Sequence, residues 1–320
     1  MSLDSKDRQN SKQTESSQKS LRAKTKQAWL GKLIKGLVVL FSWMPLRLNQ
    51  AFGQAIGTML WWIPNTNKRI TLINLKLAFP ELPEAQRVLL AKQSLLHVGM
   101  MVTELGPAWC WPESKLSPLI KEIKGQHYLD EALAHQKGVL FLAPHIGSWE
   151  MIGPYLSAKY PSTFLYRPPN IQGLEHFMVE SRGRFGAALA PTDMRGVRTL
   201  IKALKHHQVS AILPDQDAGE KGGLHAPFFG HPARTMTLAS KLIQKTKSPF
   251  LFIVFERLPK AQGYCAHFLP AEPEIASQDE ECATAALNRG VESCIKIVPE
   301  QYLWSYRRFR KPPKGIKSPY

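Results

Sequence analysis

The spacing of apolar and polar positions changes twice along the chain. Residues 1–28 are polar and rich in Ser, Gln and Lys, which is typical of a disordered basic tail. Two apolar runs follow, GLVVLFSWMPL and AFGQAIGTMLWWIP, which end at Leu46 and Pro64. Beyond residue 83, apolar residues recur first at helical spacing and then in short runs. The pattern divides the chain at residues 28 and 64, with a folded domain over 65–310 and a basic tail over 311–320.

The two apolar runs predict a helical membrane anchor over residues 29–64. Each run is shorter than the roughly 20 residues that a spanning helix needs. Together they can form one tilted span, a hairpin or an interfacial anchor. Lys24 and Lys26 precede them and Lys68 and Arg69 follow, which favours both ends facing the cytoplasm. The alternative is a pair of helices buried within a folded core.

The remainder of the chain predicts an α/β fold. A long helix is expected from Pro83 to Trp109. Short apolar runs then alternate with helical stretches near 172–184, 193–206 and 233–247. The runs predict strands at Val139–Ala143, Ser162–Tyr166, Ala187–Ala190, Val209–Leu213, Phe250–Phe255 and Tyr264–Leu269. This alternation predicts a central, mostly parallel or mixed sheet flanked by helices, with the functional site at the carboxyl ends of strands.

The charge of the chain narrows the class of partner. There are 42 Lys and Arg against 25 Asp and Glu, a formal net charge of +17. Such an excess indicates an acidic partner, which can be nucleic acid, an anionic membrane or an acidic protein. The sequence has no RNA-recognition aromatic motif, zinc-finger spacing or helix-turn-helix signature, so nucleic acid is not expected. Four cysteines without a CxxC pair argue against a zinc ribbon or a disulfide framework.

Candidate chemistry stands directly after the first predicted strand, in VLFLAPHIGSWEM. His145 and Glu150 are five positions apart and would point to different sides of an unbroken helix. Pro144 and Gly147 allow a turn that brings the carboxylate back to the ring, where it would support the imidazole as a general base. The alternative is a structural histidine and an acid that is favoured in the first turn of a helix. Ser148 lacks the GxSxG context of a nucleophile.

Four blocks in order resolve this choice by resemblance. HIGSWE has the H-x4-[D/E] form of the glycerolipid acyltransferase superfamily. The chain resembles one branch of it, the late acyltransferases of lipid A biosynthesis, from about Pro64 to the carboxyl terminus. The segments that carry the likeness are NKRITLINLKLAFPEL, YRPPN with ESRGRFG, LPDQDAGEKGGLHAPFFG and VPEQYLWSYRRFR. Glycerol-phosphate acyltransferases have F-P-E-G-T-R where this chain has Leu213 to Asp217, which favours the lipid A branch.

The resemblance implies an O-acyltransferase of Gram-negative bacteria at the cytoplasmic face of the inner membrane, held there by the apolar segment. The donor would be an acyl carrier protein thioester and the acceptor a hydroxyl of a Kdo-bearing lipid A precursor. Anionic inner-membrane lipids would contact the basic surface, and neither a metal nor an organic cofactor is implied. Another acyltransferase of the superfamily, using acyl-coenzyme A or a lysophospholipid, is the alternative.

The resemblance also assigns site residues. His145 would be the general base, supported by Glu150. Arg167, Arg182 and Arg184 would bind phosphate or carboxylate groups of the acceptor, although each can also be a solvated surface arginine. Asp215 and Asp217 follow a predicted strand and would face the same cleft, either paired with an arginine or in contact with acceptor hydroxyls.

Overall fold

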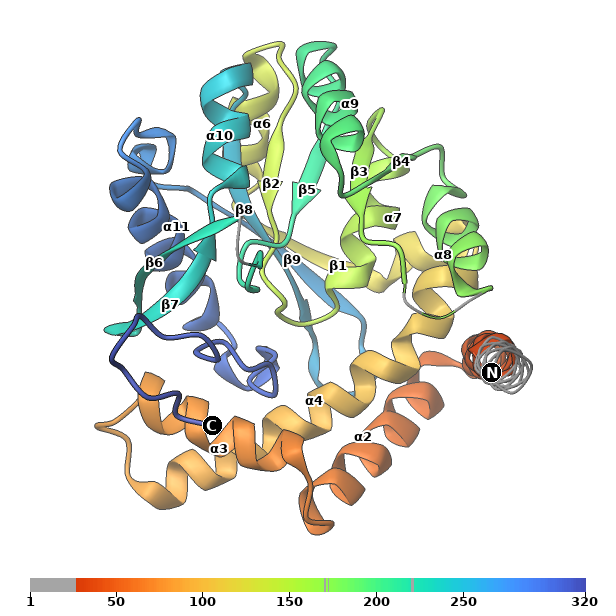
Figure 1. Cartoon of the computed structure of the whole chain (residues 1–320). Helices are drawn as coiled ribbons and strands as arrows, with labels where there is room; N and C mark the ends of the chain where they lie inside the picture. The colour runs from red at the N-terminus through yellow and green to blue at the C-terminus, as the bar shows by residue number, and fades with distance from the viewer. Residues whose placement is uncertain (1–26, 170, 172, 220–221) are drawn as a thin grey trace, which may run out of the picture.

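The protein is described by a computed structural model over residues 27–169, 171, 173–219 and 222–320 (Figure 1). The predicted basic tail over 1–28 lies outside the described residues except for its last two. Those two belong to a helix over residues 27–42.

A five-stranded mixed sheet forms the centre of the molecule. Its strand order is β1-β9-β8-β2-β5, and all neighbouring pairs are parallel except the antiparallel pair β8 and β9. The strands are β1 (Ile120–Lys124), β2 (Leu140–Leu142), β5 (Ser210–Ile212), β8 (Phe250–Arg257) and β9 (Tyr264–Leu269). The predicted α/β fold with a central mixed sheet is therefore confirmed.

Two smaller sheets extend the fold on either side of the central one. The parallel pair is β3 (Thr163–Tyr166) with β4 (Ala188–Pro191), and the antiparallel hairpin is β6 (Gly223–Phe228) with β7 (His231–Met236). All six predicted strands are present. Strand β1 escaped prediction because IKEIK is a largely exposed edge strand without an apolar run. The helix expected from residue 233 starts later, because residues 231–236 pair with β6 instead.

Helices cover the sheets and connect the strands (Figure 1). The α-helices are α2 (Leu46–Trp62), α3 (Thr66–Ala78), α4 (Glu84–Cys110), α5 (Glu113–Leu116), α6 (Gln126–Ala134), α7 (Ile152–Ser157), α8 (Leu174–Gly183), α9 (Met194–Lys205), α10 (Leu238–Thr246) and α11 (Glu280–Ile295). Short 3₁₀ turns are η1 (Ser117–Leu119), η2 (Trp149–Met151), η3 (Pro259–Ala261), η4 (Pro273–Ala276) and η5 (Pro299–Gln301).

The predicted membrane anchor is wrong. Among the described residues, no helix is both long and apolar enough to cross a membrane. Helix α2 has 17 residues, and the polar residues Asn49 and Gln50 lie in it between the two apolar runs. The Asn49 amide donates to the carbonyl oxygens of Phe41 and Thr103, each at 3.0 Å. The predicted location at the inner membrane, with this segment as its anchor, is therefore not supported.

Helix α2 packs closely against α4 through three glycines. A Cβ on Gly99 of α4 would lie 2.0 Å from the Gly53 carbonyl oxygen and 2.7 Å from the Gly57 nitrogen. The Gln50 amide adds a hydrogen bond of 2.8 Å to Glu104, which also accepts one of 2.9 Å from Arg257 on β8. The apolar segment is thus joined through α4 to the central sheet.

Sheet topology brings two strand ends together. Strands β2 and β5 are parallel neighbours, with Leu142 paired to Ile212. Their carboxyl ends therefore lie at the same edge of the sheet. His145 follows β2 by three residues and Asp215 follows β5 by three, so the two meet although 70 positions separate them.

Candidate active site

A tight turn after β2 sets the position of His145. Gly147 has a φ of +60°, and a Cβ there would lie 1.9 Å from the Phe255 carbonyl oxygen. Only glycine allows this approach, because an L side chain would meet the backbone of β8. The Ser148 nitrogen then donates to that same oxygen at 2.8 Å. The turn is thereby fixed to the sheet, and η2 begins at Trp149.

The carboxylate bonded to His145 is that of Asp215. Asp215 Oδ1 lies 2.8 Å from His145 Nδ1, and Asp215 Oδ2 accepts from the His145 backbone nitrogen at 3.0 Å. The Asp215 residue is 2% exposed. One buried carboxylate that accepts two hydrogen bonds from His145 fixes both the backbone and the ring of the histidine.

Gln216 contacts the other ring nitrogen. Its Nε2 lies 3.1 Å from His145 Nε2. An ionised carboxylate only accepts hydrogen bonds, so His145 Nδ1 carries the hydrogen that faces Asp215. Nε2 is then an acceptor with its lone pair toward the Gln216 amide. A neutral imidazole in this tautomer can take a proton at Nε2.

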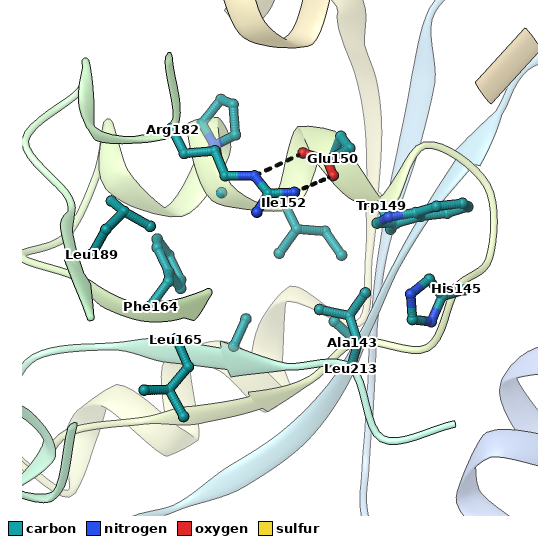
Figure 2. Close-up of a pocket in the computed structure, with 13 residues that line it drawn as sticks. Ala143, His145, Trp149, Glu150, Ile152, Phe164, Leu165, Arg182, Leu189 and Leu213 are labelled. Atoms are coloured by element: carbon teal, nitrogen blue, oxygen red, sulfur yellow. Dashed lines mark hydrogen bonds and ion pairs between the residues drawn. The ribbon is translucent and has the colours of Figure 1, made fainter. Parts of the chain in front are cut away.

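Glu150 has different partners. Arg182 holds it in a two-point pair, with Nη2 at 2.6 Å from Oε1 and Nε at 3.2 Å from Oε2. The indole nitrogen of Trp109 donates to Oε2 at 2.9 Å. In the view of Figure 2, Trp149 lies between Glu150 and the His145 ring. The expected contact between Glu150 and the imidazole is not made, and the role of Glu150 as support for the base stays a prediction.

Both carboxylates of the site favour the charged form. Burial raises the pKa of Asp215, but the charge that the His145 ring carries when protonated and the two hydrogen bonds from His145 outweigh it, so that the net pKa lies below its usual value. For Glu150, burial likewise raises the pKa, and the Arg182 charge with the hydrogen bonds of Arg182 and Trp109 brings it below the usual value. The site therefore contains two ionised acids, and each has its own donors.

A pocket opens between these groups (Figure 2). Its volume is about 200 Å³, whereas one water molecule needs only about 10–15 Å³. His145, Trp149, Glu150 and Arg182 form its polar part. Its apolar lining comes from several elements: Ala143, Ile152, Gly153, Pro154, Phe164, Leu165, Leu189, Ala211 and Leu213. Apolar walls with a few convergent polar groups are typical of a small-molecule site.

Two further predicted site residues, Arg167 and Arg184, lie in different settings. Arg167 is exposed just after β3, with no ion pair or hydrogen bond to another residue that the structure describes. Arg184 donates to the Ala108 and Trp111 carbonyl oxygens at the end of α4, at 2.7 and 3.0 Å. Burial lowers the pKa of Arg184 to about 10.

Asp217 holds the loop after β5. It accepts from Arg310 Nε and Nη2, both at 2.8 Å, and from the Gly219 nitrogen at 2.8 Å. Its backbone nitrogen donates to the Tyr306 hydroxyl at 2.9 Å. Of the two roles that the sequence left open for Asp217, pairing with an arginine is thus observed. Binding of substrate by Arg167, Arg184 or Asp217 stays a prediction.

Sequence reasoning missed Trp109 and Gln216 as parts of the site. Trp109 was visible only as a residue near the end of a long apolar helix. Gln216 stands between two aspartates in LPDQD. Its position directly after Asp215 was the one available signal, since residues that follow a parallel strand face the site.

Comparison with known proteins agrees with this geometry. Residues 14–311 match the family of bacterial lipid A biosynthesis acyltransferases. The chain is similar to the lipid A biosynthesis lauroyltransferase of Escherichia coli (strain K12), at 29% identity over 91% of this chain and 95% of the relative. It is also similar to the palmitoleoyltransferase of that strain, at 31% identity over 89% and 93%. With the myristoyltransferase of the same strain it shares 22% identity over 92% and 90%. The chain thus belongs to the bacterial lipid A biosynthesis acyltransferase family.

Proposed function

We propose that this acyltransferase moves a fatty acyl chain from an acyl carrier protein thioester to a hydroxyl of a Kdo-bearing lipid A precursor, with His145 as the general base. The observation that carries the proposal is the buried Asp215–His145 pair at the mouth of an apolar pocket. An alcohol needs its proton removed as it attacks, and an imidazole oriented by a carboxylate can remove it.

The pocket supports a route for the acyl chain. Phe164, Leu165 and Leu189 line its apolar wall, and His145 lines its polar part. A chain seated on this wall brings its thioester carbonyl to the imidazole. The acceptor oxygen forms a bond to the carbonyl carbon while its proton passes to His145 Nε2. The carbon–sulfur bond then breaks, and the departing thiolate takes that proton.

Asp215 and Gln216 have separate tasks in this scheme. Asp215 keeps the Nδ1 hydrogen in place and stabilises the imidazolium that forms. The Gln216 amide occupies the side of Nε2 that the acceptor hydroxyl must reach. We infer that the hydroxyl displaces this amide, which then remains available to donate to the substrate.

Glu150 acts in the proposal through Arg182. The pair keeps a guanidinium at the pocket wall, with the Arg182 side chain 31% exposed. Guanidinium binds phosphate or carboxylate through two parallel hydrogen bonds. Arg182, together with the exposed Arg167, is proposed to hold acidic groups of the acceptor.

Basic surface supports the acidic partners. Arg307, Lys314 and Lys317 are exposed near the carboxyl terminus, whereas Arg308 is buried and Arg310 pairs with Asp217. Within the predicted basic tail over 311–320, Lys314 and Lys317 are thus available to a partner. The exposed part suits an acidic carrier protein or anionic lipid headgroups.

The proposal is tested with purified wild-type protein and His145→Ala. Each is given acyl carrier protein and coenzyme A thioesters, with a Kdo-lipid A precursor as acceptor, and products are identified by mass. We expect transfer from the carrier-protein thioester by wild type, and a loss of about 10²–10⁴-fold in the variant. His176→Ala, at a side chain that is 92% exposed, is the matched control and should transfer normally.

Two results would contradict the proposal. Undiminished transfer by folded His145→Ala would remove the histidine from the mechanism. Transfer only from the coenzyme A thioester would assign a different donor while leaving the pocket and the base in place.

A further inference from the structure

Three side chains with metal-binding atoms meet on β8 and β9, outside the acyltransferase site. They are Glu256, Cys265 and His267, and their ligand atoms all lie within 4.8 Å of one another. Glu256 Oε2 is 2.7 Å from His267 Nε2. The proposed reaction does not use this group of a carboxylate, a thiol and an imidazole.

Strand register brings the three together. Glu256 is paired with Cys265 across the antiparallel strands, and His267 is two residues beyond Cys265 on β9. Paired residues and residues two apart share one face of a sheet. The donors therefore project from a rigid backbone, and only their side chains need to adjust to bind an ion.

A fourth donor lies on the next strand. Glu122 of β1 is paired with Cys265 from the other side, and its carboxylate interacts with the thiol. Lys124 is paired with His267 and lies 3.8 Å from Glu122. This lysine is a charge that opposes a bound cation, but its side chain is 53% exposed and can turn into solvent.

We propose that Glu256, Cys265 and His267 bind a divalent transition-metal ion of the zinc class, with Glu122 or water as the fourth ligand. Thiolate, imidazole and carboxylate together match the preference of zinc for tetrahedral sulfur, nitrogen and oxygen ligands. Magnesium and calcium prefer oxygen ligands alone, so this set selects against them.

Charge and accessibility agree with such a site. A thiolate and one carboxylate neutralise a dication, and neutral imidazole adds no charge. Cys265 is fully buried and His267 is 5% exposed, while the Glu256 and Glu122 side chains are 20% and 52% exposed. An ion can therefore enter past the two glutamates.

The site is tested on the full chain, freed of metal by a chelator and titrated with cobalt(II). Cobalt occupies zinc sites and gives a thiolate charge-transfer band in the near ultraviolet. We expect one equivalent to bind with this band, zinc to displace it, and zinc to raise Tm. Cys265→Ser should remove the band and the Tm increase. His267→Gln and Glu256→Gln should each weaken binding by more than the about 10- to 100-fold that the loss of an outer-shell partner costs.

The controls separate the cluster from other thiols and from misfolding. Cys282→Ser changes a thiol on α11 outside the cluster and should leave the band unchanged. His267→Gln keeps a donor toward Glu256, so circular dichroism should report a folded chain. Absence of a band in the wild type, or a band that survives Cys265→Ser, overturns the site. Unaltered affinity in both glutamine variants overturns the set of ligands.

Discussion

At the residue scale, one buried carboxylate decides what His145 can do. Asp215 accepts from the backbone nitrogen and from Nδ1 of the same histidine. This fixes which ring nitrogen carries hydrogen, and leaves the basic nitrogen toward Gln216. A histidine with the same exposure but no such partner would rotate and exchange tautomers.

Asp215→Asn tests this orientation. The amide is nearly isosteric but no longer selects the tautomer or balances the imidazolium, so we expect kcat to fall about 10²–10⁴-fold with little change in KM. Steady-state kinetics with the carrier-protein thioester would measure it. Asp130→Asn, on the exposed face of α6, is the matched control. A kcat equal to wild type would show that Asp215 does not act through His145.

Arg182→Ala tests the second carboxylate. It leaves the half-buried Glu150 with Trp109 as its remaining donor, so we expect the free energy of unfolding to fall by about 1–3 kcal/mol. Adding Glu150→Gln should restore part of the loss, because a neutral amide needs no counter-charge. Urea denaturation would measure both. If the double variant were less stable than Arg182→Ala, the uncompensated charge of Glu150 would not be the cause of the loss.

At the scale of elements, β3 and β4 form a wall of the pocket. Phe164 and Leu165 come from β3 and Leu189 from β4. A bulkier side chain on this wall reduces the room for an acyl chain, and each methylene in such a pocket changes the selectivity by about 10–200-fold.

Leu189→Trp is therefore expected to shift the preferred donor to a shorter acyl chain. Competition between carrier-protein thioesters of different length, with products weighed by mass spectrometry, would measure the shift. Leu89→Trp, at a leucine that is 56% exposed on α4, is the control. Unchanged selectivity in Leu189→Trp would assign the chain to another surface.

The α2–α4 contact is an element-scale feature with its own test. In Gly99→Ala the new methyl meets the α2 backbone, and we expect a loss of about 1–3 kcal/mol in the free energy of unfolding. Gly36→Ala is the matched control, because no atom lies within 4 Å of its added Cβ. Gly36 lies in the helix over residues 27–42, so its replacement by alanine should raise the free energy of unfolding by up to about 1 kcal/mol. Equal stabilities by urea denaturation would contradict the close contact.

At the scale of the whole molecule, one half-buried histidine links stability to pH. Burial, aided by the Arg257 charge, lowers the pKa of His97 from 6.5 to about 3. Between these values the unfolded chain binds a proton that the folded chain does not. His97 therefore makes the folded state less stable as pH falls from 6.5 toward 3.

In His97→Gln the unfolded chain can no longer bind a proton at position 97. The slope of unfolding free energy against pH should decrease by up to about 1.4 kcal/mol per pH unit. Urea denaturation of wild type and variant across this range would measure the difference. The exposed His176→Gln is the control. Parallel curves for wild type and His97→Gln would mean that His97 binds its proton alike in the folded and the unfolded chain.

Local patterns of this chain predicted six of its strands, its long helix and the position of His145 at a strand end. Periodicity reports such features because it reflects the backbone geometry of about ten consecutive residues. The four sequence blocks gave the family, which the comparisons confirmed.

The tertiary structure decided which distant residues meet. Strand order brought Asp215 to His145 across 70 positions. Glu150 bonds to Arg182 and Trp109 and not to His145. Close packing of α2 against α4 placed the apolar segment on the folded domain. The register of β8 and β9 brought Glu256 next to Cys265 and His267. These contacts depend on the order and register of elements remote in sequence, and no local spacing specifies that order.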